Sequence, residues 1–272
     1  MFLAAALCVW GALCFAFWQG SWQLLYHPAA QLTRTPANVG LAFDSVDFAA
    51  GDSGQPQLHG WWVPSGSRGG FTAIYLHDAN GNIGDTVDAL TSLHGAGFNI
   101  FDFDYRGYGE SQFAHPSEWR WRADAESAIS YLRETRHIPA SSLILVGKGL
   151  GANLALEVAS AHPEFAGVVV DDPIDTPMDA IFHDRRARLV PAHMLVHDRW
   201  DTAGPAKNLG IPSLWFNRAG PHGRPSDRKM DFYDKVTARK MRVWLDSSPE
   251  AAKDYSLALS RWLDELQSDR QN

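Results

Sequence analysis

The stretch Gly147-Lys148-Gly149-Leu150-Gly151 decides the fold, because it keeps the glycine spacing of a G-x-S-x-G nucleophile elbow but has glycine at the centre. The apolar run 142–146 precedes it and the small-residue segment 150–161 follows, which predicts a strand, a sharp turn and a helix. Such a turn strains the backbone of its central residue, and glycine tolerates that strain best. Because glycine has no hydroxyl, we expect the turn to persist as architecture without a nucleophile.

Strand and helix signals alternate on both sides of this turn, from about residue 41 to the C-terminus. The alternation predicts an α/β fold with a mostly parallel, twisted sheet flanked by helices. The first two strands should form a hairpin across the turn 51–54, so the sheet is expected to begin antiparallel. The expected strands are 43–49, 57–63, 71–77, 99–105, 142–146, 166–170, 211–216 and 241–245, and the last helix carries Leu259, Trp262, Leu263 and Leu266 on one face.

Composition and charge narrow the classes of partner. The chain has 272 residues, of which 45% are hydrophobic and 20% charged, which suits one globular domain plus an additional segment. Its formal net charge is -7 and it has no long basic run, so we expect no nucleic-acid partner. Both cysteines, Cys8 and Cys14, lie in the apolar N-terminus and leave no disulfide or metal-knuckle pair for the globular part. We expect no cofactor and no metal.

The N-terminus predicts a membrane anchor. Residues 1–18 contain no charged side chain, and as a helix they would extend about 27 Å, close to the hydrocarbon thickness of a bilayer. A cleaved signal peptide is the alternative, but no small-x-small cleavage pattern is evident after the apolar run, and Trp18 and Trp22 are placed as interfacial aromatics. We therefore expect residues 1–18 to form a single-pass anchor in the lipid bilayer. No strong basic cluster flanks it, and the orientation we favour puts the N-terminus in the cytoplasm and the domain outside.

Three further runs accompany the glycine-centred elbow: Leu25-Tyr26-His27-Pro28, LHDANGNI at 76–83 and FDYRGYGES at 103–111. Together the four motifs resemble a bacterial membrane-anchored α/β-hydrolase of the serine-hydrolase type that cleaves monoacylglycerols and other acyl esters. In that family the run at 76–83 is the oxyanion loop. The resemblance covers nearly the whole chain and implies the α/β-hydrolase fold, in a bacterial inner membrane with the domain on the periplasmic side. It divides the chain into an anchor (1–26), a connector (27–40) and a hydrolase-like domain (41–268), in which 173–208 form a small cap.

The catalytic residues that this resemblance implies are missing. A Ser-His-Asp hydrolase needs a nucleophile, a base that accepts its proton and an acid that orients the base. Gly149 stands at the nucleophile position, and the ungapped match puts Gly220 at the acid position. The histidine position falls near Pro249 and Glu250, and no histidine follows His222. We therefore expect a degenerate triad with no catalytic residue.

The candidate ligand-binding residues surround the vestigial nucleophile: Asp78, Ala79, Lys148, Gly149 and Leu150. Asp78 replaces a small glycine of the family beside the amides that would stabilise a tetrahedral intermediate, where a carboxylate opposes developing negative charge. The strands that end at His77 and Gly147 are neighbours in this fold, so we expect an ion pair between Asp78 and Lys148 across the former site.

These observations predict a membrane-anchored pseudoenzyme that binds an acyl or lipid-like ligand, or a protein partner. One alternative is an esterase or lipase with displaced catalytic residues, for which Ser111 and Lys148 are the candidates; we interpret Ser111 as a turn hydroxyl that holds backbone. The other alternative is nucleotide binding through 147–152, because GKGLGA also fits G-x-G-x-x-A and Asp171 follows Gly149 by 22 residues. The hydrolase-like runs on both sides of this segment argue against it.

Two features fall in the expected cap. His193 and His197 are spaced to share one helical face, but Met194 stands where a metalloprotease motif needs glutamate, so we expect no metal there. Arg185, Arg186 and Arg188 form the densest basic cluster. We interpret them as a solvated face rather than a contact with anionic lipid head groups.

Overall fold

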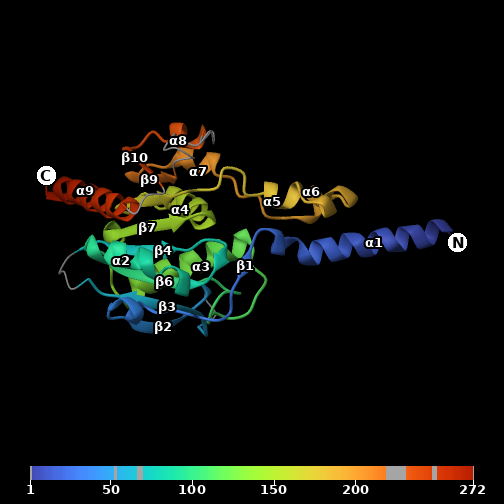
Figure 1. Ribbon diagram of the computed structural model, residues 1–272, viewed down its shortest axis with the longest axis horizontal. Helices are drawn as coiled ribbons and strands as arrows, with labels where there is room; N and C mark the ends of the chain where they lie inside the picture. Colours follow the sequence, from blue (N-terminus) through green and yellow to red (C-terminus); the bar gives the residue numbers. More distant parts are fainter. Residues whose placement is uncertain (1, 52–53, 66–69, 219–230, 247–249, 272) are drawn as a thin grey trace.

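The computed structural model describes residues 2–51, 54–65, 70–218, 231–246 and 250–271. Figure 1 shows a twisted sheet between helices, from which the N-terminal helix α1 (Phe2–Gly20) projects at one end. The predicted fold class, a mostly parallel sheet flanked by helices, is confirmed.

Within the described residues, the main sheet has eight strands in the order β10-β9-β8-β7-β4-β6-β3-β2. Strand β3 is antiparallel to β2 and to β6, which confirms the predicted antiparallel start. The strands β6, β4, β7, β8, β9 and β10, in this order across the sheet, are parallel to one another. The strands are β2 (Asp44–Ala49), β3 (Pro56–Val63), β4 (Thr72–Leu76), β6 (Asn99–Asp104), β7 (Leu143–Lys148), β8 (Gly167–Asp171), β9 (Ser213–Arg218) and β10 (Lys240–Leu245).

Helices cover both faces of this sheet and bury one apolar cluster on each. Helices α2 (Val87–Gly95) and α9 (Ala251–Gln271) pack on one face, and α3 (Glu118–Ser130) and α4 (Leu150–Ala161) pack on the other. The predicted apolar stripe of α9, from Leu259 to Leu266, is buried in the cluster on the face that α2 and α9 cover. The shorter helices are η1 (Ser21–Leu24), η2 (Pro36–Val39), η4 (Ile83–Asp85), the π-helical η5 (Tyr131–Thr135), η6 (Ala140–Ser142), α5 (Asp179–Phe182), η7 (Arg185–Leu189), α6 (Ala192–Leu195), α7 (Ala203–Asn208) and α8 (Asp231–Lys235).

A second, two-stranded sheet joins the segment after the anchor to the loop after β4. Strand β1 (His27–Pro28) pairs in parallel with β5 (Asn80–Gly81). His27 N donates to the Ala79 carbonyl at 2.8 Å, and the Asn82 side chain donates to the Ala29 carbonyl at 3.1 Å. The sequence did not predict this pairing, because two-residue strands carry no periodicity. It fixes the position of the loop that holds Asp78.

Helix α1 is long and apolar enough to cross a membrane, a property that a signal sequence shares. Most of it is exposed in the chain, but it contacts α6 and η7 of the cap, while α5 contacts η1 (Figure 1). Trp10 Nε1 donates to the Leu189 carbonyl at 3.2 Å. Below the helix, the Tyr26 hydroxyl donates to Asp198 Oδ2 at 2.5 Å and accepts from Trp200 Nε1 at 3.0 Å. Helix α1, the segment that follows it and the cap are therefore connected.

Candidate functional site at the glycine elbow

The predicted elbow is present between β7 and α4. Gly149 has φ 56° and ψ -124°, a left-handed conformation that disfavours residues with a Cβ. The flanking glycines allow close packing: a Cβ on Gly147 would lie 2.6 Å from the carbonyl carbon of Gly151, and one on Gly151 would lie 2.8 Å from that of Leu76. All three glycines are explained by the turn and by the approach of α4 to the strands.

The Asp78 side chain accepts hydrogen bonds from two backbone amides at this turn. Its Oδ1 accepts hydrogen bonds from Leu150 N at 2.9 Å and from Ala79 N at 2.7 Å. In a G-x-S-x-G elbow, the oxyanion hole consists of the amide after the nucleophile and an amide from the loop after a neighbouring strand. Leu150 follows Gly149, and Ala79 follows β4, which pairs with β7. We call these two N–H groups the elbow amides.

The same carboxyl group fills the space of the missing side chain. A Cβ built on Gly149 would overlap the Asp78 carboxyl group, with Asp78 Oδ2 at 2.8 Å and the other two carboxyl atoms closer. A nucleophile at 149 and the observed Asp78 side chain therefore exclude each other. Sequence reasoning placed Asp78 beside the amides but did not predict that it accepts from both; the signal was a carboxylate at 78 opposite a residue without a side chain.

The predicted ion pair between Asp78 and Lys148 is wrong. Lys148 is exposed at the end of β7, and no ion pair joins the two side chains in the described structure. In the strand register, Lys148 lies opposite Asp171 of β8. Burial raises the pKa of the Asp171 carboxyl to about 6, against the opposing effects of Arg218 and Lys148. The register of β7 against β8 thus places Lys148 near Asp171, while the elbow amides hold Asp78.

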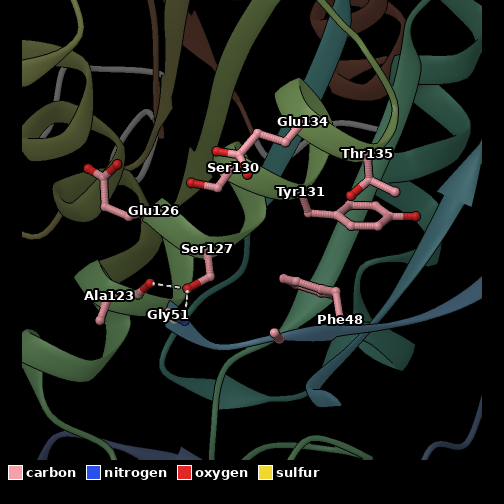
Figure 2. Close-up of a pocket in the computed structure, with 10 residues that line it drawn as sticks. Phe48, Gly51, Ala123, Glu126, Ser127, Ser130, Tyr131, Glu134 and Thr135 are labelled. Carbon is pink, nitrogen blue, oxygen red and sulfur yellow. Dashed lines mark hydrogen bonds between the residues drawn. The ribbon is translucent and has the colours of Figure 1, made fainter. Parts of the chain in front are cut away.

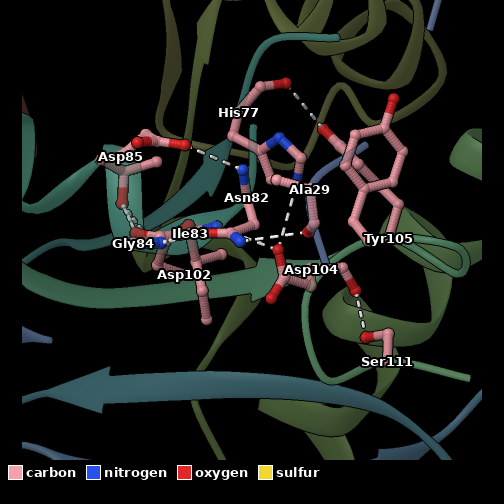
Figure 3. Close-up of polar contacts among 12 residues, drawn as sticks. Ala29, His77, Asn82, Ile83, Gly84, Asp85, Asp102, Asp104, Tyr105 and Ser111 are labelled. Carbon is pink, nitrogen blue, oxygen red and sulfur yellow. Dashed lines mark hydrogen bonds and ion pairs between the residues drawn. The ribbon is translucent and has the colours of Figure 1, made fainter. Parts of the chain in front are cut away.

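A buried polar group lies beneath the Asp78 loop (Figure 3). His77 is 2% exposed, with Nδ1 2.7 Å from the Asp78 carbonyl, and burial lowers its pKa to about 4. Asp104 Oδ1 accepts from Ile83 N at 2.9 Å and lies 3.7 Å from His77 Nε2, and burial raises the pKa of this carboxyl to about 7. Near pH 7 the imidazole is therefore neutral. Its Nδ1 contact with the Asp78 carbonyl supports the loop.

Ser111 has the predicted role of a turn hydroxyl. Its Oγ donates to the Asp104 carbonyl at 2.6 Å and accepts from His59 N at 2.9 Å. Both bonds hold the chain after β6 against β3. They leave Ser111 as a structural hydroxyl rather than a displaced nucleophile.

A second group of Ser, His and Asp, not predicted from the sequence, lies on β2 and β3. His59 Nδ1 is 2.8 Å from Asp47 Oδ1, and His59 Nε2 is 3.4 Å from Ser45 Oγ, which is the order of contacts in a catalytic triad. However, Nε2 also lies 3.2 Å from Glu110 Oε2. A ring nitrogen that donates to a carboxylate cannot accept a proton from serine. We interpret this group as a clamp that joins the edge strand to the segment after β6.

The remaining predicted positions fall in three places. Of the expected cleft residues, Ala79 and Leu150 are buried, Asp78 and Gly149 are partly exposed and Lys148 is exposed. Gly220 and Pro249 lie outside the described residues, and Glu250 is an exposed turn residue whose carbonyl accepts from Lys253 N. The predicted helical face shared by His193 and His197 is wrong, because α6 ends at Leu195. Among the described residues, no group of His, Cys, Asp and Glu is arranged to hold a metal ion.

A hollow lies away from the elbow, between β2 and α3 (Figure 2). Its volume is about 440 Å³, and Phe48 and Tyr131 line it together with the carboxylates Glu126 and Glu134. Gly51 N donates to Ser127 Oγ across its floor at 2.8 Å. It shares no residue with the elbow.

Comparisons with known proteins agree with this geometry. The family described as "Serine aminopeptidase, S33" matches residues 72–195. The uncharacterised protein Rv2307c of Mycobacterium tuberculosis is 32% identical over 167 residues, which is 60% of this chain and 57% of that protein. The uncharacterised protein YfhR of Salmonella typhi is 34% identical over 126 residues, 45% of this chain and 41% of that protein. The chain thus spans little more than half of the first relative's length. The esterase Pf2001 of Pyrococcus furiosus matches at a TM-score of 0.66 and 17% identity, over 89% of this chain and 97% of that structure.

Proposed function

We propose that this protein, which is related to the α/β-hydrolases and has their fold, has lost ester hydrolysis at its elbow and acts as a membrane-attached binding protein. The observation that carries the proposal is the Asp78 carboxyl group on both elbow amides. The absence of a hydroxyl at Gly149 supports it independently.

The elbow amides matter because they supply catalysis even without a triad. Removal of a whole triad leaves roughly 10³-fold to 10⁴-fold acceleration over water, which comes from the oxyanion hole and from substrate binding. Here the oxyanion of a tetrahedral intermediate would have to displace Asp78 from two hydrogen bonds. A carboxylate beside that position would also repel the developing negative charge. The residual activity is therefore suppressed together with the triad.

Neither alternative function gains support from the site. Ser111 is held by two backbone bonds, and Lys148 is exposed rather than desolvated, so neither is placed as a substitute nucleophile. Nucleotide binding through 147–152 would need free amides at the start of α4 for a pyrophosphate. The Leu150 amide already donates to Asp78.

The surfaces of the molecule favour a partner over an acyl ligand at the elbow. Ala79 and Leu150 are buried, and Asp78 fills the space above Gly149. By contrast, large apolar side chains are exposed along α1 and on the cap, including Trp10, Leu189 and Met194. Exposed apolar surface of this kind marks contact with a membrane or with another protein. We infer that binding takes place at this end of the molecule.

The test is the activity of the full chain in lipid nanodiscs. We expect no labelling by a fluorophosphonate probe and a turnover of p-nitrophenyl esters below about 10⁻³ s⁻¹, roughly 10⁴-fold under a typical enzyme. Gly149→Ser alone should stay equally inactive, because Asp78 obstructs the new hydroxyl and no base is in place.

The matched controls are two variants that free the elbow amides. Asp78→Gly leaves position 149 without a hydroxyl, and Asp78→Gly/Gly149→Ser adds a serine hydroxyl there. Because no base is in place, we expect both variants to stay unlabelled. Labelling confined to the double variant would show that Asp78 blocks the site and would contradict the absence of a base. Robust labelling and turnover of the natural chain, both lost when one side chain is changed, would refute the proposal.

A further inference from the structure

The cap contacts the anchor at the middle of the helix and not only at its end. Trp10 Nε1 donates to the Leu189 carbonyl at 3.2 Å. Between Trp10 and the end of the helix, a cavity of about 340 Å³ separates the two elements, lined on one side by Leu13 and Phe17 of α1 and on the other by Arg186 and Val190. Helix α6 and η7 contact this half of α1, and Figure 1 shows α6 alongside it.

This contact conflicts with a full crossing of the bilayer. Trp10 precedes Gly20, the last residue of α1, by ten positions, which corresponds to about 15 Å along a helix. Half of a hydrocarbon core is also about 15 Å thick. If the whole of α1 spanned the core, the Leu189 carbonyl would lie near the centre of the bilayer.

The cap has the wrong chemistry for that depth. Helix η7 carries three exposed arginines, Arg185, Arg186 and Arg188, and it ends at the exposed Leu189. A charged side chain at the bilayer centre is costly, and three arginines multiply that cost. Of these three arginines, Arg186 forms an ion pair with Asp184, which also attracts Arg185. Among the described residues no ion pair within 4.0 Å involves Arg185 or Arg188, and both side chains are exposed.

The same composition suits the boundary between head groups and acyl chains. Leu189 is 62% exposed and Met194 80% exposed, so apolar side chains and arginines occupy one short segment. Interfacial membrane segments combine these two residue types, because the apolar side chains enter the acyl boundary while the cations face lipid phosphates. The net charge of the whole chain is -7, so attraction to anionic lipid must come from this local cluster.

We propose that α1 and the cap enter a single leaflet together, with Arg185 and Arg188 at the phosphates of anionic phospholipids. Only Phe2–Val9 then lies deeper than the cap, and eight helical residues extend about 12 Å, less than half of the hydrocarbon core. The docked protein is therefore a one-leaflet membrane protein that recognises an anionic lipid surface. This inference rests on the proposed membrane attachment through α1, but not on the loss of activity at the elbow.

The depth of the cap is tested on the full chain with one cysteine. Cys8→Ser and Cys14→Ser remove both natural thiols. Met194→Cys then carries an NBD fluorophore. The control is Leu257→Cys, because Leu257 is 59% exposed and belongs to α9, which lies at the end of the molecule opposite α1. In nanodiscs with nitroxide-labelled lipid, the probe at 194 should lose most of its fluorescence in phosphatidylcholine–phosphatidylglycerol and less in phosphatidylcholine alone, whereas the probe at 257 should be unchanged.

The charge requirement has its own matched pair. Arg185→Gln/Arg188→Gln should abolish the extra quenching that phosphatidylglycerol produces. Arg133→Gln/Arg261→Gln, which removes the same charge from exposed positions outside the cap, should preserve it. If quenching of the probe at 194 is the same in the natural chain and in both pairs of substitutions, and the same in both lipid mixtures, the assignment of the arginines is overturned.

The one-leaflet depth is tested at the N-terminal end of the helix. In the same cysteine-free background, Phe2→Cys in proteoliposomes should resist an impermeant maleimide on both sides of the membrane. Labelling from the side opposite the domain would show a full crossing and overturn the inference, as would an unquenched probe at 194 in both lipid mixtures. Neither result depends on esterase activity, so failure here is distinguishable from failure of the proposed function.

Discussion

At the scale of single residues, the site is defined by a pair of side chains that fit each other. Gly149 leaves a space above the elbow, and the Asp78 carboxyl group fills it while accepting from both elbow amides. A buried amide without a partner costs about 1 to 3 kcal/mol, so the carboxyl group stabilises the turn as well as closing it. The elbow has thus become part of the internal packing.

The fit between these two residues predicts a strong coupling. Gly149→Ala should reduce the free energy of unfolding by roughly 2 to 4 kcal/mol, because it adds a Cβ at a positive φ and against Asp78. In the Asp78→Gly background the overlap is gone, and we expect only about 1 kcal/mol, the cost of the backbone conformation. Urea unfolding of the four proteins measures the difference.

The control for this cycle is Gly95→Ala at the end of α2, where a Cβ would meet no atom within 4 Å and φ is not positive. It should have the same small effect in both backgrounds. Equal costs of Gly149→Ala with and without Asp78 would contradict the steric fit.

The buried imidazole predicts how stability depends on pH. Burial lowers the pKa of His77 to about 4, below its ordinary value near 6.5. Between these values the unfolded chain binds more protons than the folded chain at this site, so stability rises with pH across the window and is lost as pH falls. From pH 7.5 to 4.5 the natural protein should lose roughly 2 to 3 kcal/mol more than His77→Gln, which has no titrating ring.

Asp104 works in the opposite direction, because its pKa is raised to about 7, so that the folded chain keeps a proton that the unfolded chain releases. Asp104 is present in both proteins, so its contribution to the pH dependence of the unfolding free energy largely cancels when the natural protein is compared with His77→Gln. Urea unfolding at the two pH values provides the data. Parallel losses in both proteins would show that His77 does not titrate as its burial requires.

At the scale of elements, the sequence predicted the strands and the elbow well because their residues repeat with a clear period. The expected strand 166–170 is β8 (Gly167–Asp171), and the expected helix 150–161 coincides with α4. The pairing of β1 with β5 could not be predicted in this way, since it depends on contacts between distant segments of two residues each. The ends of the cap helices were also missed, as α6 stops before His197.

One of the links between the N-terminal segment and the cap is the buried hydroxyl of Tyr26, which gives a prediction for this contact. Tyr26→Phe should leave Trp200 Nε1 and Asp198 Oδ2 without their partner and reduce the free energy of unfolding by about 1 to 3 kcal/mol. Hydrogen exchange should speed up in the cap segment around Trp200, because the loss is local.

The comparison variant is Tyr131→Phe, whose hydroxyl accepts only from Arg136 Nε at 3.1 Å at a partly exposed position. We expect less than about 0.5 kcal/mol from it, as for a surface contact. If both variants behave alike, the Tyr26 contact does not fasten the cap.

At the scale of the whole molecule, the α/β-hydrolase fold could be predicted because four separate motifs and the alternation of elements agreed. The candidate site was only half predictable. The residue types at 78, 148 and 149 were plain in the sequence, but the choice of Asp78 for the elbow amides over Lys148 depends on the register of β4 against β7 and on the side-chain direction. Likewise, the sequence could not show that η7, which carries the three exposed arginines, contacts α1.

The small sheet of β1 and β5 gives the chain a mechanical route from α1 to the elbow. The first strand after α1 is bonded to Asn80–Gly81, and His27 N holds the carbonyl of Ala79, the residue next to Asp78. Tension that draws α1 away from the domain would be borne first by the cap contacts of Trp10 and Tyr26, and then by these few bonds. After the cap, the loop at the elbow is thus the next part of the domain to feel a pull on α1, ahead of the strands of the main sheet.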